Sequence, residues 1–318
     1  METELEIPER LGWVGRTPAG RAWLAVLPAR LAECVQRWGL RLQGPPFPYA
    51  HASLALPAKL PDGTRAVLKL QYPDADSAHE ATALTCWAGD GAARLLAHDP
   101  GRRALLVERC DPGTSLHATV QDQARRAAAQ DETRAGTLGG ARREPLDAAL
   151  DVVVGLLPRL WRPAGAPFTP LAEEAAGWLE RLPVQWARLG RPFERRLLDA
   201  GLGRLAELAG TQGEQVLVNQ DLHAGNILRA TREPWLVIDP KPLAGEREFG
   251  VVAIVRGPEL GHSPAAVRRR LDRLTDELGL DRERALGWAI GHTLAWSMAE
   301  DVVFTNQIDV ARWLLDFA

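Results

Sequence analysis

The stretch NQDLHAGNILRATREPWLVID, residues 219–239, carries the strongest indication of this chain's fold. It places Asp221, His223 and Asn226 close together and ends on a second acidic residue, Asp239. Two short apolar runs, ILRA and WLVID, flank the turn sequence TREP, which predicts a β-hairpin. Antiparallel pairing about that turn sets Asn226 opposite Asp239. Two such oxygen ligands, with a carboxylate five residues upstream of Asn226, suit a Mg²⁺-nucleotide site beside a general base.

The same segment resembles the catalytic loop and metal-binding strand of the aminoglycoside phosphotransferases, a branch of the kinase-like fold. Its continuation, WLVIDPKPLAGE at residues 235–246, resembles the streptomycin 6-kinase and hydroxyurea phosphotransferase group, and DPKP is the more specific part. The resemblance implies an α+β fold, two-lobed and protein-kinase-like, that uses ATP and Mg²⁺. It also implies that Asp221 orients and deprotonates an acceptor hydroxyl, while Asn226 and Asp239 hold Mg²⁺ against the ATP phosphates.

Lysine is scarce in this chain, since only Lys59, Lys69 and Lys241 stand among 38 lysines and arginines. A lysine in such a background indicates a position where a compact ammonium is needed and a planar guanidinium does not serve. Lys69 ends the strand-like run RAVLKL, and the resemblance makes it the lysine that contacts the α- and β-phosphates. Lys241 follows Asp239 by two residues and is expected at the nucleotide as well. Chance placement of these lysines is the alternative.

A helix is predicted over residues 74–89, and Glu80 lies on it eleven residues after Lys69. The kinase resemblance predicts an ion pair between Glu80 and Lys69. The alternative is a solvated glutamate, which the helix dipole favours in a first turn. Residues 91–100 and 102–110 predict two further strands. The second resembles the kinase hinge, where main-chain groups from Glu108 to Cys110 would bind adenine.

Two stretches depart from the kinase pattern. Residues 45–60 contain no glycine, although kinases often cover the phosphates with a glycine-rich turn. The family usually begins its catalytic loop with His-Gly-Asp, and this chain has Asn219-Gln220-Asp221. Glutamine at position 220 is hard to accommodate if the backbone there needs a positive φ. These departures keep open a nucleotide-binding pseudokinase or regulator. A metal-dependent hydrolase using Asp221, His223 and Asp239 is a third hypothesis, although no further histidine cluster accompanies His223.

The chain of 318 residues exceeds one average domain. The order of its elements predicts a mixed N-lobe, residues 1–110, and a mainly helical C-lobe, residues 111–318. A net charge of −3 gives no sign of a nucleic-acid surface, and no apolar run is long enough to span a membrane. Neither nucleic acid nor membrane is therefore expected as a partner. Cys34, Cys86 and Cys110 show no CxxC spacing and indicate buried, reduced thiols in a cytoplasmic protein.

The acceptor is expected to bind the last helices of the chain. ERALGWAIGHTLAWSMAEDVV, residues 283–303, resembles the terminal helix of the streptomycin kinase group. Glu300 and Asp301 are candidate contacts for an amine or guanidinium, Trp296 for a ring or cation, and His223 is a further substrate candidate. The alternative is a packed tryptophan and solvated carboxylates. By resemblance the acceptor is a hydroxyl of an aminoglycoside such as streptomycin, at its 6-hydroxyl, or of a related amino sugar; hydroxyurea is a further candidate.

Periodicity predicts the remaining helices over residues 17–40, 146–162, 171–182, 192–208, 265–278, 282–301 and 307–317. Residues 115–143 are polar and rich in Ala, Arg and Gln, and are expected to form an insertion that is part helix and part loop.

Overall fold

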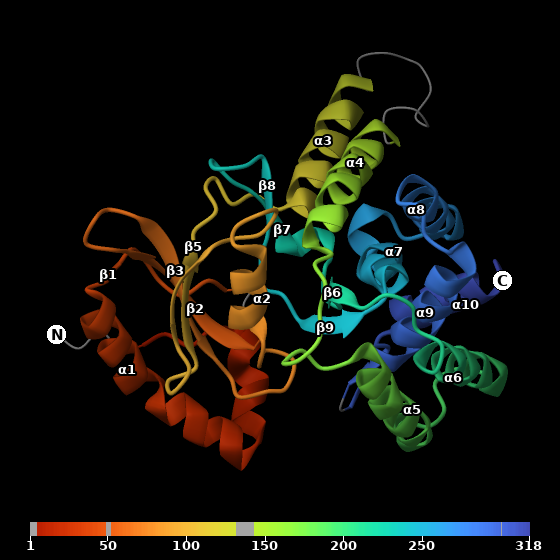
Figure 1. The fold of residues 1–318 in the computed structure, drawn as a ribbon, viewed down its shortest axis with the longest axis horizontal. Helices are drawn as coiled ribbons and strands as arrows, with labels where there is room; N and C mark the ends of the chain where they lie inside the picture. Colours follow the sequence, from red (N-terminus) through yellow and green to blue (C-terminus); the bar gives the residue numbers. More distant parts are fainter. Residues whose placement is uncertain (1–4, 49–51, 132–142, 300) are drawn as a thin grey trace. The chain divides into compact units, whose positions relative to one another are not determined.

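The computed structural model describes residues 5–48, 52–131, 143–299 and 301–318. The chain divides into two compact units, Met1–Gly113 and Thr114–Ala318, which are called here the amino-terminal and carboxy-terminal units (Figure 1). Each unit has its own sheet or hairpins and its own helices.

The amino-terminal unit is built on a five-stranded antiparallel sheet in the order β1-β2-β3-β5-β4. The strands of this sheet are β1 (Arg41–Leu42), β2 (Ser53–Lys59), β3 (Arg65–Gln71), β4 (Leu95–Asp99) and β5 (Ala104–Glu108). The strands predicted at residues 65–70 and 102–110 are present as β3 and β5, and the strand predicted at 91–100 is present as the shorter β4.

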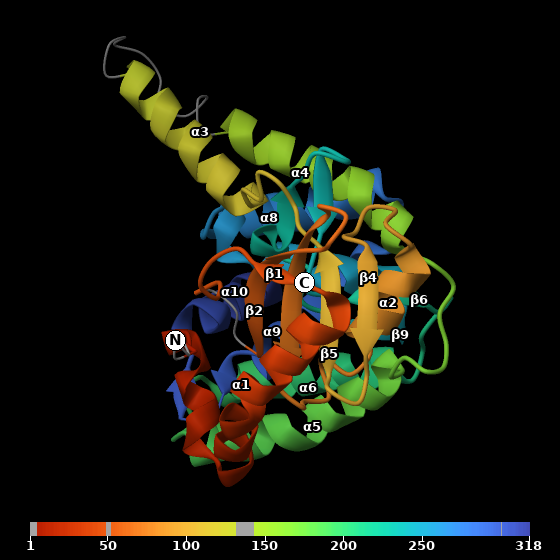
Figure 2. The ribbon, with the colours of Figure 1, turned by 90° about the vertical axis from the view of Figure 1, so that its left-hand side faces the viewer.

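One face of this sheet is covered by α1 (Pro18–Trp38) and the short helix η1 (Glu9–Arg16), and Figure 2 shows α1 crossing in front of the strands. Leu68 and Leu70 of β3 belong to the apolar cluster beneath them. Side chains alternate along a strand, so Lys69 and Gln71 point to the opposite face. That face receives α2 (Glu80–Trp87), which brings Glu80 to Lys69.

The carboxy-terminal unit is mainly helical, and α9 lies at its centre (Figure 1). Helix α9 packs against α5, α6, α7, α8 and α10, and its residues Leu286 to Leu294 are buried all round, as expected for a helix without a solvent face. The helices are α3 (Leu116–Asp131), α4 (Arg143–Leu160), α5 (Leu171–Arg188), α6 (Arg195–Ala209), α7 (Val252–Arg256), α8 (Pro264–Glu277), α9 (Arg282–Ala295) and α10 (Thr305–Leu315).

Short strands carry the segment of residues 219–239. β6 (Val216–Asn219) pairs with β9 (Pro242–Gly245), and β7 (Ile227–Arg229) pairs with β8 (Trp235–Val237), so the predicted hairpin forms. The short helices η2 (Ala224–Asn226), η3 (Arg247–Val251) and η4 (Pro258–Leu260) connect these strands to α7 and α8.

Several predicted boundaries are corrected. The helix expected over residues 282–301 ends at Ala295, because the chain turns back into a hairpin of β10 (Met298–Ala299) and β11 (Val302–Val303). The Phe304 N–H donates to the Ser297 carbonyl and closes this hairpin. The helix expected over 74–89 begins only at Glu80, because the Asp74 carboxylate accepts the Ser77 N–H and holds a turn before it.

Other differences concern helix lengths and one thiol. The helix expected over 171–182 continues to Arg188 and contains Pro183. The polar insertion predicted at 115–143 forms α3 and the start of α4, and its residues 132–142 lie outside the described part of the chain. Cys86 is exposed, so the prediction that all three thiols are buried is wrong for that residue.

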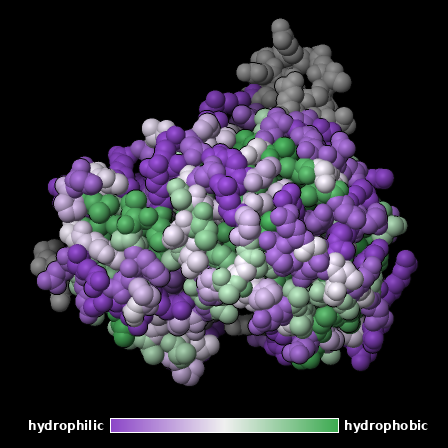
Figure 3. Space-filling view, in the orientation of Figure 1, coloured by the Kyte–Doolittle hydropathy of each residue, from purple (hydrophilic) through white to green (hydrophobic). Residues whose placement is uncertain are grey.

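The molecular surface in Figure 3 mixes hydrophilic residues with small apolar patches. Large exposed apolar side chains such as Val184 and Phe304 belong to different elements and do not form one stripe. Within the described residues, every helix is too short or too polar to cross a membrane.

Candidate active site

Asn219 ties the predicted catalytic loop to the segment that follows the hairpin. Its Oδ1 accepts the backbone N–H groups of Asp221 and Lys241, each at 3.0 Å. The Gln220 N–H donates to the Lys241 carbonyl at 3.1 Å, which extends the pairing of β6 with β9. One amide side chain therefore fixes Asp221 relative to Lys241, although 20 residues separate them in the sequence.

Gln220 needs no left-handed backbone. The described non-glycine residues with positive φ are Ala88, Arg103, Arg191 and Asp239, and Gln220 is not among them. Its side chain is buried, with 3% exposed. The replacement of the family's His-Gly by Asn219-Gln220 therefore brings no φ-related strain, which removes one of the two grounds for a non-catalytic protein.

The register of the hairpin differs by one residue from the expected one. Ile227 pairs with Val237, and the Ile238 N–H donates to the Asn226 carbonyl at 2.9 Å. Asn226 therefore lies opposite Ile238, and the prediction that it faces Asp239 directly is wrong. Asp239 follows in the left-handed region, with φ of 52°, which swings the chain out of the strand.

Asn226 and Asp239 offer the oxygen donors that Mg²⁺ prefers. The Asn226 Nδ2 donates to the Asp221 carbonyl at 3.0 Å, which leaves the side-chain oxygen to face a cation. Asp239 is exposed at the end of the hairpin. In the described part of the chain no group of three or more His, Cys, Asp and Glu residues forms a metal cluster. Two protein oxygens fit Mg²⁺, because this ion usually keeps waters and phosphate oxygens in its remaining positions.

Asp221 lies beside a cation that is itself held by an aromatic ring. The Lys241 Nζ is 3.5 Å from the Asp221 Oδ2 and 5.0 Å from the centroid of the Trp296 ring. Both charged side chains are partly buried, with 19% of Asp221 and 26% of Lys241 exposed. This environment keeps a positive charge next to the Asp221 carboxylate.

His223 forms a second charged contact near Asp221. Its Nδ1 lies 3.2 Å from the Glu259 Oε1 and 3.1 Å from the Gly225 nitrogen. One nitrogen cannot accept the Gly225 N–H and donate to Glu259 at once, so the first contact requires a bare Nδ1 and the second a proton on Nδ1, which both the neutral Nδ1–H tautomer and the imidazolium carry. Burial lowers the pKa of His223, but the hydrogen bond to Glu259 and the charges of Asp221 and Glu259 outweigh it and raise that pKa.

Glu259 responds in the opposite direction. Burial raises its pKa, but the hydrogen bond and charge of His223 outweigh this effect, so that the Glu259 pKa lies below its ordinary value. His223 and Glu259 therefore favour a charged pair at mildly acidic pH.

Arg256 contacts the same tryptophan as Lys241. Its guanidinium carbon is 4.7 Å from the Trp296 ring centroid, and its Nη1 is 3.4 Å from the Gln307 Oε1. Burial lowers the pKa of Arg256, and the negative charges of Asp221 and Glu259 offset only part of this effect, so the pKa lies below its ordinary value. Both carboxylates therefore lie within electrostatic range of Arg256.

Arg256 and Glu259 were not expected from the sequence. They lie around the turn VRGPEL, where the only local signal is the Gly257-Pro258 pair that ends an apolar run. Tertiary folding of η4 against the loop brings them to residues 221–223.

In the amino-terminal unit, the predicted ion pair is present. The Lys69 Nζ lies 2.5 Å from the Glu80 Oε1, and the two residues are 7% and 2% exposed. The Gln71 Nε2 donates to the other carboxylate oxygen at 2.7 Å. Gln71 was not predicted, although its position two residues after Lys69 on a strand places it on the same face.

The remaining candidates are spread over both units. The Glu108 carboxylate at the end of β5 accepts the Arg94 N–H at 3.0 Å, and Cys110 is buried. Asp301 lies in the β10–β11 turn, is 87% exposed and pairs with Arg188 at 3.1 Å. Glu300 lies outside the described residues.

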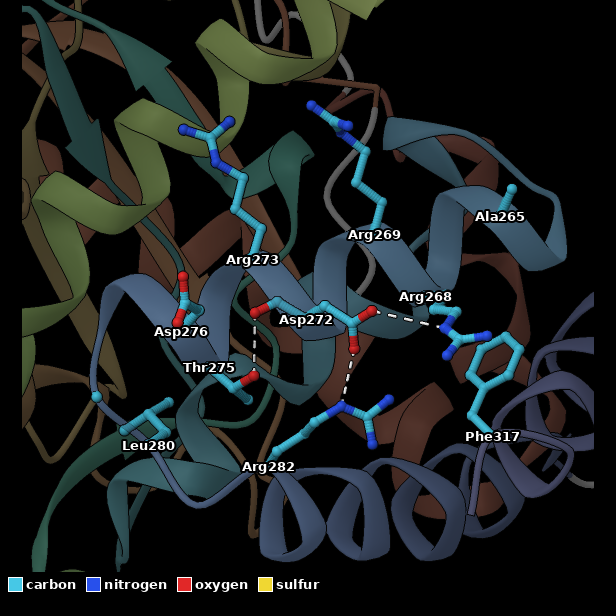
Figure 4. Close-up of a pocket in the computed structure, with 11 residues that line it drawn as sticks. Ala265, Arg268, Arg269, Asp272, Arg273, Thr275, Asp276, Leu280, Arg282 and Phe317 are labelled. Atoms are coloured by element: carbon cyan, nitrogen blue, oxygen red, sulfur yellow. Dashed lines mark hydrogen bonds and ion pairs between the residues drawn. The ribbon is translucent and has the colours of Figure 1, made fainter.

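A pocket of the carboxy-terminal unit lies apart from these residues (Figure 4). It is formed by α8, the connection to α9 and Phe317 near the chain end. Its arginines are already paired, since Asp272 contacts Arg268 at 3.6 Å and Arg282 at 2.8 Å. Arg269 pairs with Asp147, and Arg273 pairs with Asp151 and Glu277, so each arginine of the pocket already has a carboxylate partner, which does not favour a phosphate group.

A profile of the aminoglycoside/hydroxyurea antibiotic resistance kinase family matches residues 37–146 and 141–302. The chain belongs to this family. A streptomycin 6-kinase from Streptomyces glaucescens is 41% identical over 281 residues, which cover 86% of this chain and 83% of that protein. A hydroxyurea phosphotransferase from Kitasatospora aureofaciens is 41% identical over 300 residues, covering 92% and 79%.

The structure resembles a choline kinase, LicA from Streptococcus pneumoniae, with a TM-score of 0.58 and 11% identity over 90% of this chain and 98% of that one. This likeness confirms the protein-kinase-like fold. Family membership confirms that the chain is a phosphotransferase acting on a hydroxyl group, and it does not favour the pseudokinase alternative.

Proposed function

We propose that this kinase transfers the γ-phosphoryl group of ATP, with Mg²⁺, to a hydroxyl of an aminoglycoside such as streptomycin, at its 6-hydroxyl, or of a related amino sugar. The observation that carries the proposal is the tie between Asp221 and the segment that follows the hairpin. The Asn219 Oδ1 accepts the backbone N–H groups of Asp221 and Lys241, which stand at the two ends of residues 221–241. A carboxylate, two oxygen ligands and a lysine therefore come from one folded segment.

In this proposal Asp221 orients the acceptor hydroxyl and takes its proton, while Lys241 lies beside the carboxylate at 3.5 Å. Asn226 and Asp239 would hold Mg²⁺, which neutralises phosphate charge when it is bound. Lys69 would contact the α- and β-phosphates, with Glu80 and Gln71 fixing its ammonium. The main-chain groups from Glu108 to Cys110 would bind adenine.

The acceptor's positive groups need nearby carboxylates. Glu259, which pairs with His223 close to Asp221, and the exposed Asp301 are two such groups in the carboxy-terminal unit. An ammonium or guanidinium substituent would compete with protonated His223 for Glu259. We therefore assign His223 and Glu259 to the acceptor side of the site, with Asp301 and Glu300 as further candidates.

The test is ADP release from Mg-ATP in the presence of streptomycin, other aminoglycosides, glucosamine, hydroxyurea and choline. Acceptor-dependent turnover is expected with an aminoglycoside. Asp221→Ala should abolish transfer and leave ATP binding intact, whereas Asp199→Ala, which removes an exposed helix carboxylate, should have no effect. An active Asp221→Ala enzyme would refute the assignment.

A non-catalytic nucleotide binder makes different predictions. It would bind ATP and release no ADP with any acceptor. Gln220→Gly would then be the variant to restore turnover, because it brings the loop closer to the usual motif. Since Gln220 needs no positive φ, we expect Gln220→Gly to give no gain in activity.

A further inference from the structure

Arg256 has fewer partners than its surroundings would lead one to expect. Among the described residues, its buried Nε has no hydrogen-bond partner, and its Nη1 makes one long bond, of 3.4 Å, to Gln307. In the described part of the chain, no carboxylate oxygen comes within 4.0 Å of its guanidinium. A guanidinium carries five N–H donors, so most of the donors of Arg256 are left without a protein partner.

Arg270 of α8, which binds the segment that follows Arg256, shows what a structural arginine looks like. It is 1% exposed, and its donors bind the carbonyls of Val255, Leu260 and Gly261 at 2.7 to 3.1 Å. These bonds fix the turn that carries Arg256 and Glu259. The fold thus saturates one arginine with carbonyls and leaves its neighbour Arg256 with donors to spare.

The spare donors of Arg256 lie close to the proposed chemistry. One tryptophan ring, Trp296, contacts both Arg256 and Lys241, and Lys241 reaches Asp221 at 3.5 Å. Two neighbouring cations repel each other, and the indole ring that both contact can attract each of them. Glu259 already pairs with His223.

A guanidinium with N–H donors to spare at this place fits an anionic ligand. The acceptor proposed above is cationic, so the anion that has to come close to Asp221 is the phosphoryl group itself. The planar guanidinium fork matches two phosphoryl oxygens, and such a contact is strongest when most of the charge lies on those oxygens.

We propose that Arg256 contacts the phosphoryl group as it passes from ATP to the acceptor, and that Trp296 is a positioning residue that holds Arg256 and Lys241 on either side of this path. The inference rests on the proposed function. In the step, a bond forms between the acceptor oxygen and the γ-phosphorus, and the bond from the γ-phosphorus to the β,γ-bridging oxygen breaks. The hydroxyl proton goes to Asp221, and ADP leaves with the bond electrons.

The first experiment compares Arg256→Met and Arg256→Lys with Arg268→Met. Arg268 is a matched control, because its guanidinium also lies over an aromatic ring, 5.5 Å from the Phe317 centroid, but at the pocket of Figure 4. Arg256→Met should lower kcat by about 10²- to 10³-fold, as removal of one transition-state donor does elsewhere. Arg256→Lys should recover part of this loss, and Arg268→Met should turn over like the wild type.

A second readout requires no acceptor. The affinity for Mg-ADP is measured by calorimetry with and without tetrafluoroaluminate, a planar mimic of the phosphoryl group. The wild type should bind Mg-ADP more tightly with the mimic, and Arg256→Met should lose this gain while its affinity for Mg-ADP alone changes less than about twofold.

Stability separates a binding role from a structural one. Removal of a poorly satisfied cation should leave the Tm of Arg256→Met equal to or above that of the wild type. A Tm that falls in Arg256→Met and recovers in Arg256→Lys, together with an unchanged response to the mimic, would assign Arg256 to structure and overturn the proposal. A full kcat in Arg256→Met would overturn it as well.

Trp296 is tested by the same measurements. Trp296→Leu should lower kcat with little change in the KM for ATP, and Trp296→Phe should recover part of the loss because a phenyl ring also attracts cations. If no acceptor supports ADP release by the wild type, the proposed function fails. The response to tetrafluoroaluminate still decides whether Arg256 binds a phosphoryl group, and a wild type that does not respond refutes that role.

Discussion

Replacing Lys69 with methionine isolates the buried ion pair of the amino-terminal unit. Methionine keeps the apolar length of the lysine stem but removes the ammonium, so the Glu80 carboxylate stays at 2% exposure without its cation. Breaking a buried pair from one side costs about 3–5 kcal/mol. Because Gln71 still donates to the other carboxylate oxygen at 2.7 Å, we expect a loss near the lower end, about 3 kcal/mol.

The second variant is Lys69→Met combined with Glu80→Gln. The new amide side chain at position 80 would carry no charge and would still bond to Gln71, so the double variant should lose less than about 1 kcal/mol relative to the wild type. The second substitution should therefore recover about 2 kcal/mol of the loss in Lys69→Met, because the two residues are in direct contact and their effects are not additive.

The assay is hydrogen exchange of the β3 amides, which reports the free energy of opening of the amino-terminal unit. A whole-chain melt is less suitable, because a chain with two units does not have to unfold in one step. Lys59→Met is the control, since Lys59 is a less buried lysine at the end of β2 and should change this free energy by less than about 0.5 kcal/mol. A loss below about 1 kcal/mol for Lys69→Met, or no recovery in the double variant, would refute the reasoning.

Three further variants test other parts of the structure. Because the pKa of His223 is raised, its contribution to the free energy of unfolding is fully present below pH 6.5 and is lost as the pH rises through the raised pKa. Because the pKa of Glu259 is lowered, its contribution is fully present above pH 4.5 and is lost as the pH falls through the lowered pKa. Glu259→Gln should therefore lower Tm most between pH 4.5 and pH 6.5 and least near pH 9. An equal fall in Tm at pH 5.5 and at pH 9 would contradict the pairing of His223 with Glu259. Gly155→Ala, at an exposed position inside α4 where a Cβ meets nothing within 4 Å, should stabilise by about 1 kcal/mol, measured by urea denaturation. Gly20→Ala should destabilise by about 1–3 kcal/mol in the same assay, because its Cβ would lie 1.7 Å from the Val14 carbonyl oxygen; a wild-type midpoint would show that this contact relaxes freely.

Local sequence signals were enough to predict most of the helices and strands, and also the ion pair between Lys69 on β3 and Glu80 on α2. Strand alternation, helical spacing and turn residues act over a few positions, so they place Lys69 on its strand and Glu80 on the helix that follows. The boundaries were less well determined. The helix of residues 282–301 ends early because the β10–β11 hairpin, which pairs with itself, competes for the same residues.

The sequence alone determined the kinase-like family and predicted a catalytic loop, because Asp221, Asn226 and Asp239 are close in the chain and their spacing is specific. Tertiary structure decided what surrounds them. The hairpin register shifted by one residue, which depends on backbone hydrogen bonds that spacing does not fix. The contacts of Arg256 and Lys241 with Trp296 join three segments that are distant in the sequence, so no local pattern records them. Burial and the distance between charges exist only once these segments pack together, and they are what distinguish Arg256 from Arg270, whose donors are bound by carbonyls.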